Sequence, residues 1–202
     1  IVIENGINID KFKNAIPYKK EELNSNFTED TKLVCMVGRF SEQKDQVTLI
    51  KAMKQLPDDV HLLLVGEGPL RKQNEDLAEN IGLKNRVHFL GFRNDVDRIL
   101  KTSDIIVLSS HWEGLSLASI EGMASGKPFV ASKVQGLKEV VDGYGVTFKQ
   151  GDSNELSKIL LNLINNNDYY KEICNKCSER AKMYDINNMV NSMISTYYEL
   201  LM

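Results

Sequence analysis

The sequence is short of the residues that mark several classes of protein. Its only cysteines are Cys35, Cys174 and Cys177, which are too few for a disulfide scaffold and favour a reducing, cytoplasmic location. No apolar run approaches the roughly 18 residues that a membrane-spanning helix needs, and no signal peptide is expected. Basic residues number 25 against 28 acidic ones, so a nucleic-acid partner is not expected either.

What is present is the composition of an ordinary globular domain. Apolar residues make up 42% of the 202 residues, which is enough for one domain with a sizeable core. The chain opens on Ile1 rather than on methionine, and we therefore expect residues 1–202 to be a piece of a longer protein.

Apolar runs and helical repeats alternate along the chain. Short runs rich in β-branched residues predict strands at 32–38, 60–66, 87–90, 104–109, 129–131 and 145–148. Helical spacing with start and stop signals predicts helices at 45–55, 69–81, 95–101, 116–126, 137–141 and, with a break near Tyr184, 154–202. Residues 17–30 are interpreted as a short helix or a linker. Because this alternation favours parallel pairing through right-handed crossovers, we expect a doubly wound α/β domain, with a parallel sheet of about six strands and C-terminal helices.

The ligand of such a domain lies beyond the carboxyl ends of its strands. The loops at that edge are 38–45, 66–69, 91–94, 110–116 and 133–136. In the first loop, Arg39 and Lys44 are expected to project into one crevice, where a guanidinium and an ammonium suit a pyrophosphate; two surface cations are the alternative. The run Gly66-Glu67-Gly68 lacks the third glycine of a dinucleotide fingerprint and is interpreted as a tight strand-to-helix turn.

The stretch HWEGLSLASIEGMASG carries two carboxylates with seven residues between them. Glu113 is expected in the loop and Glu121 about two turns into the helix, with Ser116 as the N-cap between them. Their separation, on the order of 10 Å, suits a long polyhydroxyl ligand better than a metal ion. Free N–H groups near Leu117 and Ala118 add an anion site, so the order of groups matches a nucleotide-sugar. A solvated helix face is the alternative interpretation of the two carboxylates.

Other reactive side chains carry weaker signals. Cys174 and Cys177 form a CxxC pair on a predicted helix, with no second pair and no histidines nearby, so no metal site is expected. His61 and His88 lie inside apolar strands and are expected in the core or at its edge. His111 is interpreted as a structural hydrogen-bonding residue rather than as a base.

Taken together, these motifs resemble the retaining glycosyltransferases of the GT-B fold, and more narrowly their group 1 family, also called family 4. The resemblance rests on GRF-x3-K after a strand, on VGEGP and RVHFLGF, on SDIIVLSSHWEGLSLASIEGMASGKPFVAS, and on GLKEVV. The opening IENGINIDKF is similar to the segment that begins the family's C-terminal domain. The resemblance covers nearly the whole chain. It implies that residues 1–202 are the Rossmann-like, nucleotide-sugar-binding half of a GT-B enzyme.

The resemblance also implies roles for the matching residues. Arg39 and Lys44 would act as catalytic groups that bind the donor pyrophosphate and stabilise the leaving nucleotide, and Glu113 would contact the transferred sugar. The remaining donor-binding positions would be Gly38, the backbone of Ser116, Leu117 and Ala118 for the phosphates, Glu121 for the ribose hydroxyls, and Phe92 and Arg93 near the base.

The chain departs from the family pattern in three ways. Asp45 stands where glycine is usual, and Leu115-Ser116 stands where Phe-Gly is common. The N-terminal domain, which in the family carries most of the acceptor site, is absent from this chain. Because the final helix would cross back to that domain, we expect an exposed apolar patch around Met189, Ile194 and Tyr197.

The leading hypothesis is a retaining glycosyltransferase whose full-length form moves a sugar from a UDP- or GDP-linked donor to a glycan or lipid-linked acceptor, in polysaccharide biosynthesis. The family does not usually need a bound metal, so no cofactor is expected, and the isolated domain is expected to be inactive. A peripheral attachment to the inner membrane face, through the missing domain, stays open. Two alternatives also stay open: a nucleotide-sugar epimerase of the same fold, and a non-catalytic nucleotide-binding module.

Overall fold

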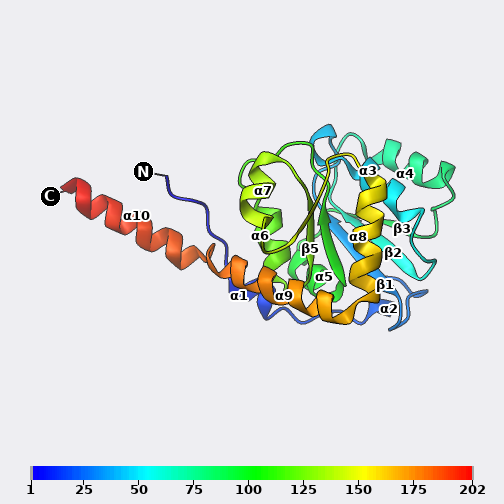
Figure 1. Ribbon diagram of the computed structural model, residues 1–202, viewed down its shortest axis with the longest axis horizontal. Coiled ribbons are helices and arrows are strands. Elements are labelled where there is room, and N and C mark those ends of the chain that lie inside the picture. Colours follow the sequence, from blue (N-terminus) through cyan, green and yellow to red (C-terminus); the bar gives the residue numbers. More distant parts are fainter. Residues whose placement is uncertain (1, 202) are drawn as a thin grey trace.

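The apolar runs of the sequence form six parallel strands, seen in a computed structural model that describes residues 2–201 (Figure 1). The strands are β1 (Lys32–Val37), β2 (Val60–Val65), β3 (Val87–Gly91), β4 (Ile105–Leu108), β5 (Phe129–Ser132) and β6 (Val146–Phe148). Their order is β3-β2-β1-β4-β5-β6, and each neighbouring pair is parallel. The predicted doubly wound α/β fold is confirmed.

Helices cover both faces of the sheet, and the central strands are therefore buried on both sides. One face carries α3 (Gln46–Met53), α4 (Arg71–Asn80) and α8 (Ser153–Asn165). The other carries α5 (Val96–Thr102), α6 (Leu117–Ala124) and α7 (Gln135–Val141). The smaller elements are α1 (Ile9–Lys13), α2 (Lys20–Leu23) and the 3-10 turn η1 (Glu42–Lys44), and the chain ends with α9 (Asn167–Lys182) and α10 (Ile186–Leu201).

The direction in which the chain winds reverses between β1 and β4. From β1 it proceeds outward to β2 and β3, and it then returns to place β4 on the other side of β1. In open α/β sheets the ligand lies at the carboxyl ends of the two strands that flank such a switch point. The loops that follow β1 and β4 are the ones that carry Lys44 and Glu113.

The start of the chain is fastened to the beginning of α10. Ile7 forms a parallel bridge with Asp185, donates its N–H to the carbonyl of Tyr184 at 2.9 Å, and accepts the N–H of Ile186 at 2.9 Å. Gly6 lies so close that a Cβ there would be 2.7 Å from the Cα of Ile186. The two ends of the described chain therefore leave the body of the domain together, as Figure 1 shows.

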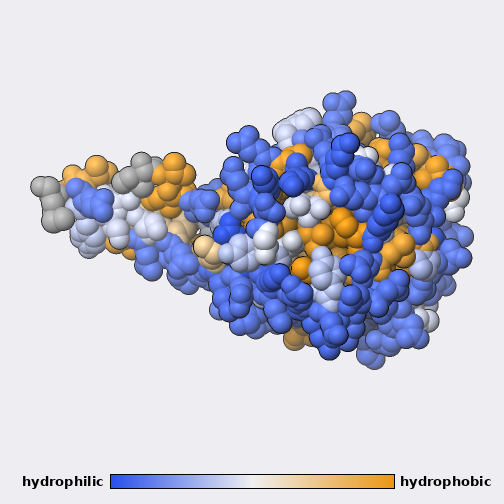
Figure 2. All heavy atoms as spheres, in the orientation of Figure 1, coloured by the Kyte–Doolittle hydropathy of each residue, from blue (hydrophilic) through white to orange (hydrophobic). Residues whose placement is uncertain are grey.

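Helix α10 projects away from the sheet and carries apolar side chains into solvent (Figure 2). Ile194 is 47% exposed and Tyr197 62% exposed, which confirms that part of the predicted patch. Met189, by contrast, is half-buried rather than exposed, and its sulfur accepts the N–H of Gly6 at 3.3 Å. No helix within residues 2–201 is both long and apolar enough to cross a membrane.

The C-terminal helical region is divided more finely than the sequence predicts. The expected break near Tyr184 is present, but a second one falls at Asn166, between α8 and α9. The side chain of Asn166 accepts the N–H of Tyr169 at 3.0 Å and so caps α9. Helix α1 was not predicted from the sequence, and its N-terminus is capped in the same way by Asn8.

Candidate functional site

The candidate site lies at the carboxyl edge of the sheet, where the loops after β1 and β4 meet. Lys44 donates to Glu113 Oε1, and Ser110 Oγ donates to the same oxygen at 2.7 Å. The side chains of Lys44 and Glu113 are only 15% and 7% exposed. The structure therefore brings two predicted catalytic residues together as a largely buried ion pair, which the sequence did not foresee. Arg39, the third of them, is exposed on the same loop.

The conformation of Asp45 sets the position of Lys44. Asp45 has a φ of 46° and is the only non-glycine residue of the described chain with a positive φ. Aspartate tolerates this left-handed conformation better than most residues, which accounts for its presence where the resembled family usually has glycine. Its carboxylate caps α3 by accepting from Thr48 N at 3.2 Å and Thr48 Oγ1 at 2.5 Å. Ser109 Oγ donates to the Asp45 carbonyl at 2.7 Å and so ties the β4 loop to this turn.

Glycines allow the loops after β1 and β2 to approach each other closely. A Cβ on Gly66 would lie 2.2 Å from the carbonyl oxygen of Gly38, and one on Gly68 would lie 2.4 Å from that of Phe40. The interpretation of Gly66-Glu67-Gly68 as a tight structural turn is confirmed. A Cβ on Gly38 would meet the methylenes of Lys44 at 3.4 Å, so Gly38 lies under the side chain of the predicted catalytic lysine.

A further glycine supports the loop of Glu113 from the other side. A Cβ on Gly136 would lie 2.2 Å from the Gly114 carbonyl oxygen and 2.3 Å from that of Glu113. Helix α7, which contains Gly136, therefore packs directly on the backbone that carries the buried carboxylate. The motif GLKEVV was recognised in the sequence, but this positioning role was not; it follows only from the contact across the fold.

Helix α6 presents the remaining predicted donor-binding groups. Ser116 is its N-cap residue, as predicted, but the Ser116 hydroxyl makes no capping hydrogen bond. The first N–H groups of the helix, including those of Leu117 and Ala118, have no intrahelical acceptor. Glu121 lies one turn further on, and within residues 2–201 its carboxylate makes no hydrogen bond or ion pair. Burial raises the pKa of Glu121, while Lys11 on α1 opposes that rise.

The two residues predicted to lie near the base, Phe92 and Arg93, follow β3 but differ in their contacts. The Phe92 side chain is 75% exposed. Arg93 instead donates to both oxygens of Asp95, at 2.7 and 2.5 Å, and the Tyr18 hydroxyl donates to the same carboxylate at 2.5 Å. The Arg93 hydrogen bonds hold the pKa of Asp95 well below its usual range. Arg93 is therefore engaged within its own loop, and Asp95 and Tyr18 are polar partners that the sequence analysis missed.

The histidines serve structural contacts. His111 lies 2.9 Å from Gln150 Nε2 and 3.7 Å from the Asp45 carboxylate, in agreement with a hydrogen-bonding role. His88 lies on the edge strand β3 and contacts His61 on the neighbouring strand β2, with 3.0 Å between His61 Nδ1 and His88 Nε2. The pKa of His88 is lowered to about 4, mainly by burial and to a smaller extent by the neighbouring His61.

The CxxC pair lies away from the site. Cys174 and Cys177 are free thiols on α9, and burial raises the pKa of Cys177 to about 12. Within residues 2–201, no group of three or more histidine, cysteine and acidic side chains is placed to hold a metal ion.

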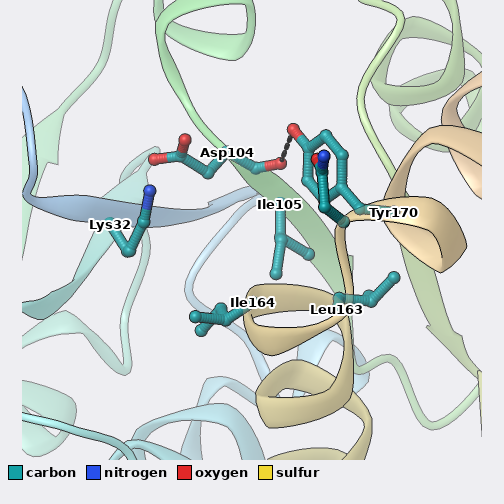
Figure 3. A pocket seen from close by; sticks show the side chains of 7 residues that line it. Lys32, Asp104, Ile105, Leu163, Ile164 and Tyr170 are labelled. Atoms are coloured by element: carbon teal, nitrogen blue, oxygen red, sulfur yellow. Dashed lines mark hydrogen bonds between the residues drawn. The ribbon is translucent and has the colours of Figure 1, made fainter.

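A separate cavity lies at the opposite, amino-terminal edge of the sheet. It measures about 200 Å³, and its walls combine side chains of β1, β4, α8 and α9 (Figure 3). The Tyr170 hydroxyl donates to the Asp104 carbonyl at 2.9 Å on one side, and Ile164 and Leu163 face the cavity from α8. Because its residues come from the starts of the strands, the cavity is remote from the crevice beside Lys44.

The fold and the edge at which these groups gather define a Rossmann-like domain of the kind found in GT-B glycosyltransferases. Residues 18–184 match the family described as "Glycosyl transferases group 1". The chain belongs to that family.

Curated relatives agree with this assignment. The chain is 33% identical over 186 residues to the Escherichia coli UDP-Gal:alpha-D-GlcNAc-diphosphoundecaprenol alpha-1,3-galactosyltransferase, a match that covers 82% of this chain and 47% of that enzyme. It is 34% identical over 164 residues to an uncharacterized glycosyltransferase of Methanocaldococcus jannaschii, covering 75% of this chain and 42% of the relative. The chain thus spans about half the length of the curated relatives it matches.

Solved structures share the fold over nearly the whole chain. HepE of Anabaena, in complex with UDP, superposes with a TM-score of 0.89 at 28% identity, over 98% of this chain and 57% of that one. The C-terminal domain of a group 1 family protein from Francisella tularensis superposes with a TM-score of 0.78 at 22% identity, over 90% of this chain and 100% of that one. The second likeness shows the fold alone.

Proposed function

We propose that this chain is the donor-binding domain of a retaining glycosyltransferase, and that it binds a nucleotide-sugar at the crevice between β1 and β4. The observation that carries the proposal is the pairing of Lys44 with Glu113 beside Arg39, directly ahead of the N-terminus of α6. Cations, a carboxylate and free N–H groups at one sheet edge meet the needs of a ligand that carries both phosphates and hydroxyls. The presence of UDP in the HepE structure supports this ligand class.

In the proposed complex the pyrophosphate lies between the β1 loop and α6. Arg39 and Lys44 contact its oxygens from one side, and the N–H groups of Leu117 and Ala118 do so from the other. The carboxylate of Glu121, which has no partner within the described residues, accepts hydrogen bonds from the ribose hydroxyls. Phe92 lies near the base, and Glu113 contacts the transferred sugar.

The same arrangement accounts for catalysis of donor cleavage. As the bond between the sugar and the pyrophosphate lengthens, negative charge grows on the departing phosphate. Arg39 and Lys44 therefore stabilise the transition state, in which this charge has grown, more than the bound donor, and this difference lowers the barrier of the step. Before the donor binds, Glu113, which accepts from Ser110, holds Lys44 in the crevice, so little reorganisation is needed when the phosphate arrives. Retention of configuration is part of the proposal through the family resemblance.

We also propose that an N-terminal domain of the same polypeptide completes the enzyme and holds a glycan or lipid-linked acceptor. The chain covers only 47% of the E. coli galactosyltransferase, so about half of a whole enzyme would lie outside it. Gly6 lies next to the start of α10, and α10 exposes Ile194 and Tyr197. An apolar helix face of this kind is expected to be covered by that second domain.

The experiment that tests donor binding is a thermal-shift panel of UDP, GDP, ADP and their common sugar conjugates. A nucleotide present at 100 times its dissociation constant stabilises the folded state by roughly 2.7 kcal/mol. We expect one base to be selected and the shift to be lost in Arg39→Ala and in Glu121→Gln. Lys158→Ala, an exposed lysine on α8, is the matched control and should retain the shift. An equal shift in all variants would contradict the proposed site.

A further inference from the structure

The only tryptophan of the chain, Trp112, stands next to Glu113 and is 57% exposed. Its backbone and ring are nevertheless held in place. Gln43 Nε2 donates to the Trp112 carbonyl at 3.0 Å, and the indole stacks on the His111 ring with 6.3 Å between centroids and an interplanar angle of 23°. A fixed, solvent-facing indole at the rim of a binding crevice is a ready surface for a ligand.

Two hollows open beside this indole and share one wall. One has a volume of about 420 Å³ and the other about 470 Å³, both within the roughly 300–1,000 Å³ that is typical of small-molecule pockets. Trp112, Ser41, Glu42 and Leu70 line both hollows. Arg39 lines the second hollow, so the pair extends outward from the phosphate-binding side of the crevice.

The walls of the hollows offer hydroxyl, amide and carboxylate groups around the aromatic face. Gln73 and Asn74 add two amides to the first hollow. Asn74 is 1% exposed; its Nδ2 donates to the Leu70 carbonyl at 2.8 Å, whereas its Oδ1 has no hydrogen-bond partner within residues 2–201. A buried hydrogen-bond acceptor that has no donor lowers the stability of the folded state. Because Asn74 Oδ1 is itself buried, the groups open to a hydroxyl-rich ligand are those of Glu42 and Gln73, which are exposed.

We propose that the hollows form a subsite for one pyranose ring of the acceptor glycan, stacked on Trp112. This inference rests on the proposed function and deepens it. A pyranose has an apolar face of C–H groups, which suits the indole, and a rim of hydroxyls, which suits Glu42 and Gln73. Arg39 lines the second hollow, but Glu113 and Glu121, which are assigned to the donor's sugar and ribose, line neither hollow, and the ring is therefore assigned to the acceptor.

The test uses the fluorescence of Trp112, which is the only indole signal in the chain. Methyl α-glucoside, methyl α-galactoside, methyl N-acetyl-α-glucosaminide and maltose are titrated in turn. At least one should give a saturable shift in the emission. Saturation-transfer NMR with that sugar should show the strongest transfer to the ring protons of one C–H face.

Variants then separate stacking from general effects on the fold. Trp112→Ala should weaken the NMR-detected binding by roughly tenfold, whereas Trp112→Phe should retain most of it, because the aromatic face remains. Tyr198→Ala removes another exposed aromatic, 66% exposed on α10, and should leave the sugar affinity unchanged. Sugar affinity that is unchanged in Trp112→Ala would overturn the proposal.

Calorimetric titrations of UDP into the same samples test the acceptor subsite and the donor-binding function separately. If a nucleotide binds and no saccharide does, the acceptor subsite is wrong while the donor-binding function stands. If neither binds, the proposed function itself fails. If both bind and Trp112→Ala weakens only the saccharide, the subsite is supported.

Discussion

Replacing Lys44 by methionine should destabilise the fold strongly, although Lys44 lies in a functional crevice rather than in the core. Methionine keeps a long unbranched side chain over Gly38, where the lysine methylenes now lie, but it removes the ammonium from Glu113. The remaining carboxylate is 7% exposed and would keep only the hydrogen bond from Ser110 at 2.7 Å.

The size of the effect follows from the cost of an uncompensated buried charge. Breaking a buried ion pair by removing one partner typically costs about 3–5 kcal/mol. Because Ser110 still donates to Glu113, we expect a loss of about 2–4 kcal/mol in the free energy of unfolding. For a domain of this size that corresponds to a fall in Tm of roughly 4–16 °C.

Urea denaturation of matched variants measures this loss. Glu113→Gln should cost less than Lys44→Met, because the freed ammonium is the more exposed partner, at 15%, and has a flexible stem that reaches water. The double variant Lys44→Met/Glu113→Gln should recover much of the stability lost in Lys44→Met, since no buried charge is left. Lys44→Met with wild-type stability, or a double variant that is merely the sum of the two single losses, would refute the reasoning.

Three further predictions follow from the geometry of the loops and of the sheet edge. The pKa of His88 is lowered to about 4 in the folded state, whereas it is near 6.5 in the unfolded chain. Between these two pH values the unfolded state binds a proton at His88 that the folded state does not, so the free energy of unfolding should fall as the pH drops from about 6.5 to about 4. His88→Gln should flatten this part of a urea-midpoint profile, and an unchanged slope would contradict the assignment. Gly136→Ala should displace the Glu113 loop, lower the free energy of unfolding by about 1–3 kcal/mol and weaken nucleotide binding. A calorimetric titration of nucleotide that matches wild type would show that the loop accommodates the added methyl group without moving the site. Asp45→Ala should lower the free energy of unfolding, measured by urea denaturation, by about 2 kcal/mol, because alanine neither caps α3 nor tolerates the left-handed backbone conformation. Asp45→Gly should lower it clearly less, because glycine adopts this conformation without strain. A larger loss in Asp45→Gly than in Asp45→Ala would show that backbone strain is not the cause.

The sheet was predictable because its strands are buried on both faces and therefore appear as uninterrupted apolar runs. The ends of the predicted strands determine which loops share an edge of the sheet, and the sequence therefore predicts that the loops of Arg39, Lys44 and Glu113 lie together. The break at Asn166 was missed because the apolar periodicity of α8 continues with little change into α9. The three consecutive asparagines at 165–167 were the available signal, since asparagine is a favoured N-cap residue.

The partners of the site residues could not be predicted, because they arise from contacts between segments distant in sequence. Lys44 and Glu113 are 69 residues apart, and no local pattern joins them. Arg93 was expected beside the base, but it is held by Asp95, which in turn accepts from Tyr18, 77 residues earlier in the chain. Asp45 could be noticed only as a departure from the family pattern, and its left-handed backbone supplies the reason for it.

The most direct test of the central claim is the binding of UDP and 2′-deoxy-UDP to the wild-type chain and to Glu121→Gln, measured by calorimetry; the corresponding GDP pair replaces them if the panel selects guanine. If the Glu121 carboxylate accepts from the ribose, removing the 2′-hydroxyl should weaken binding to the wild type by about tenfold or more and should have a much smaller effect on the variant. An equal loss of affinity in both proteins, or no binding of either nucleotide, would contradict the assignment of this crevice as the donor site.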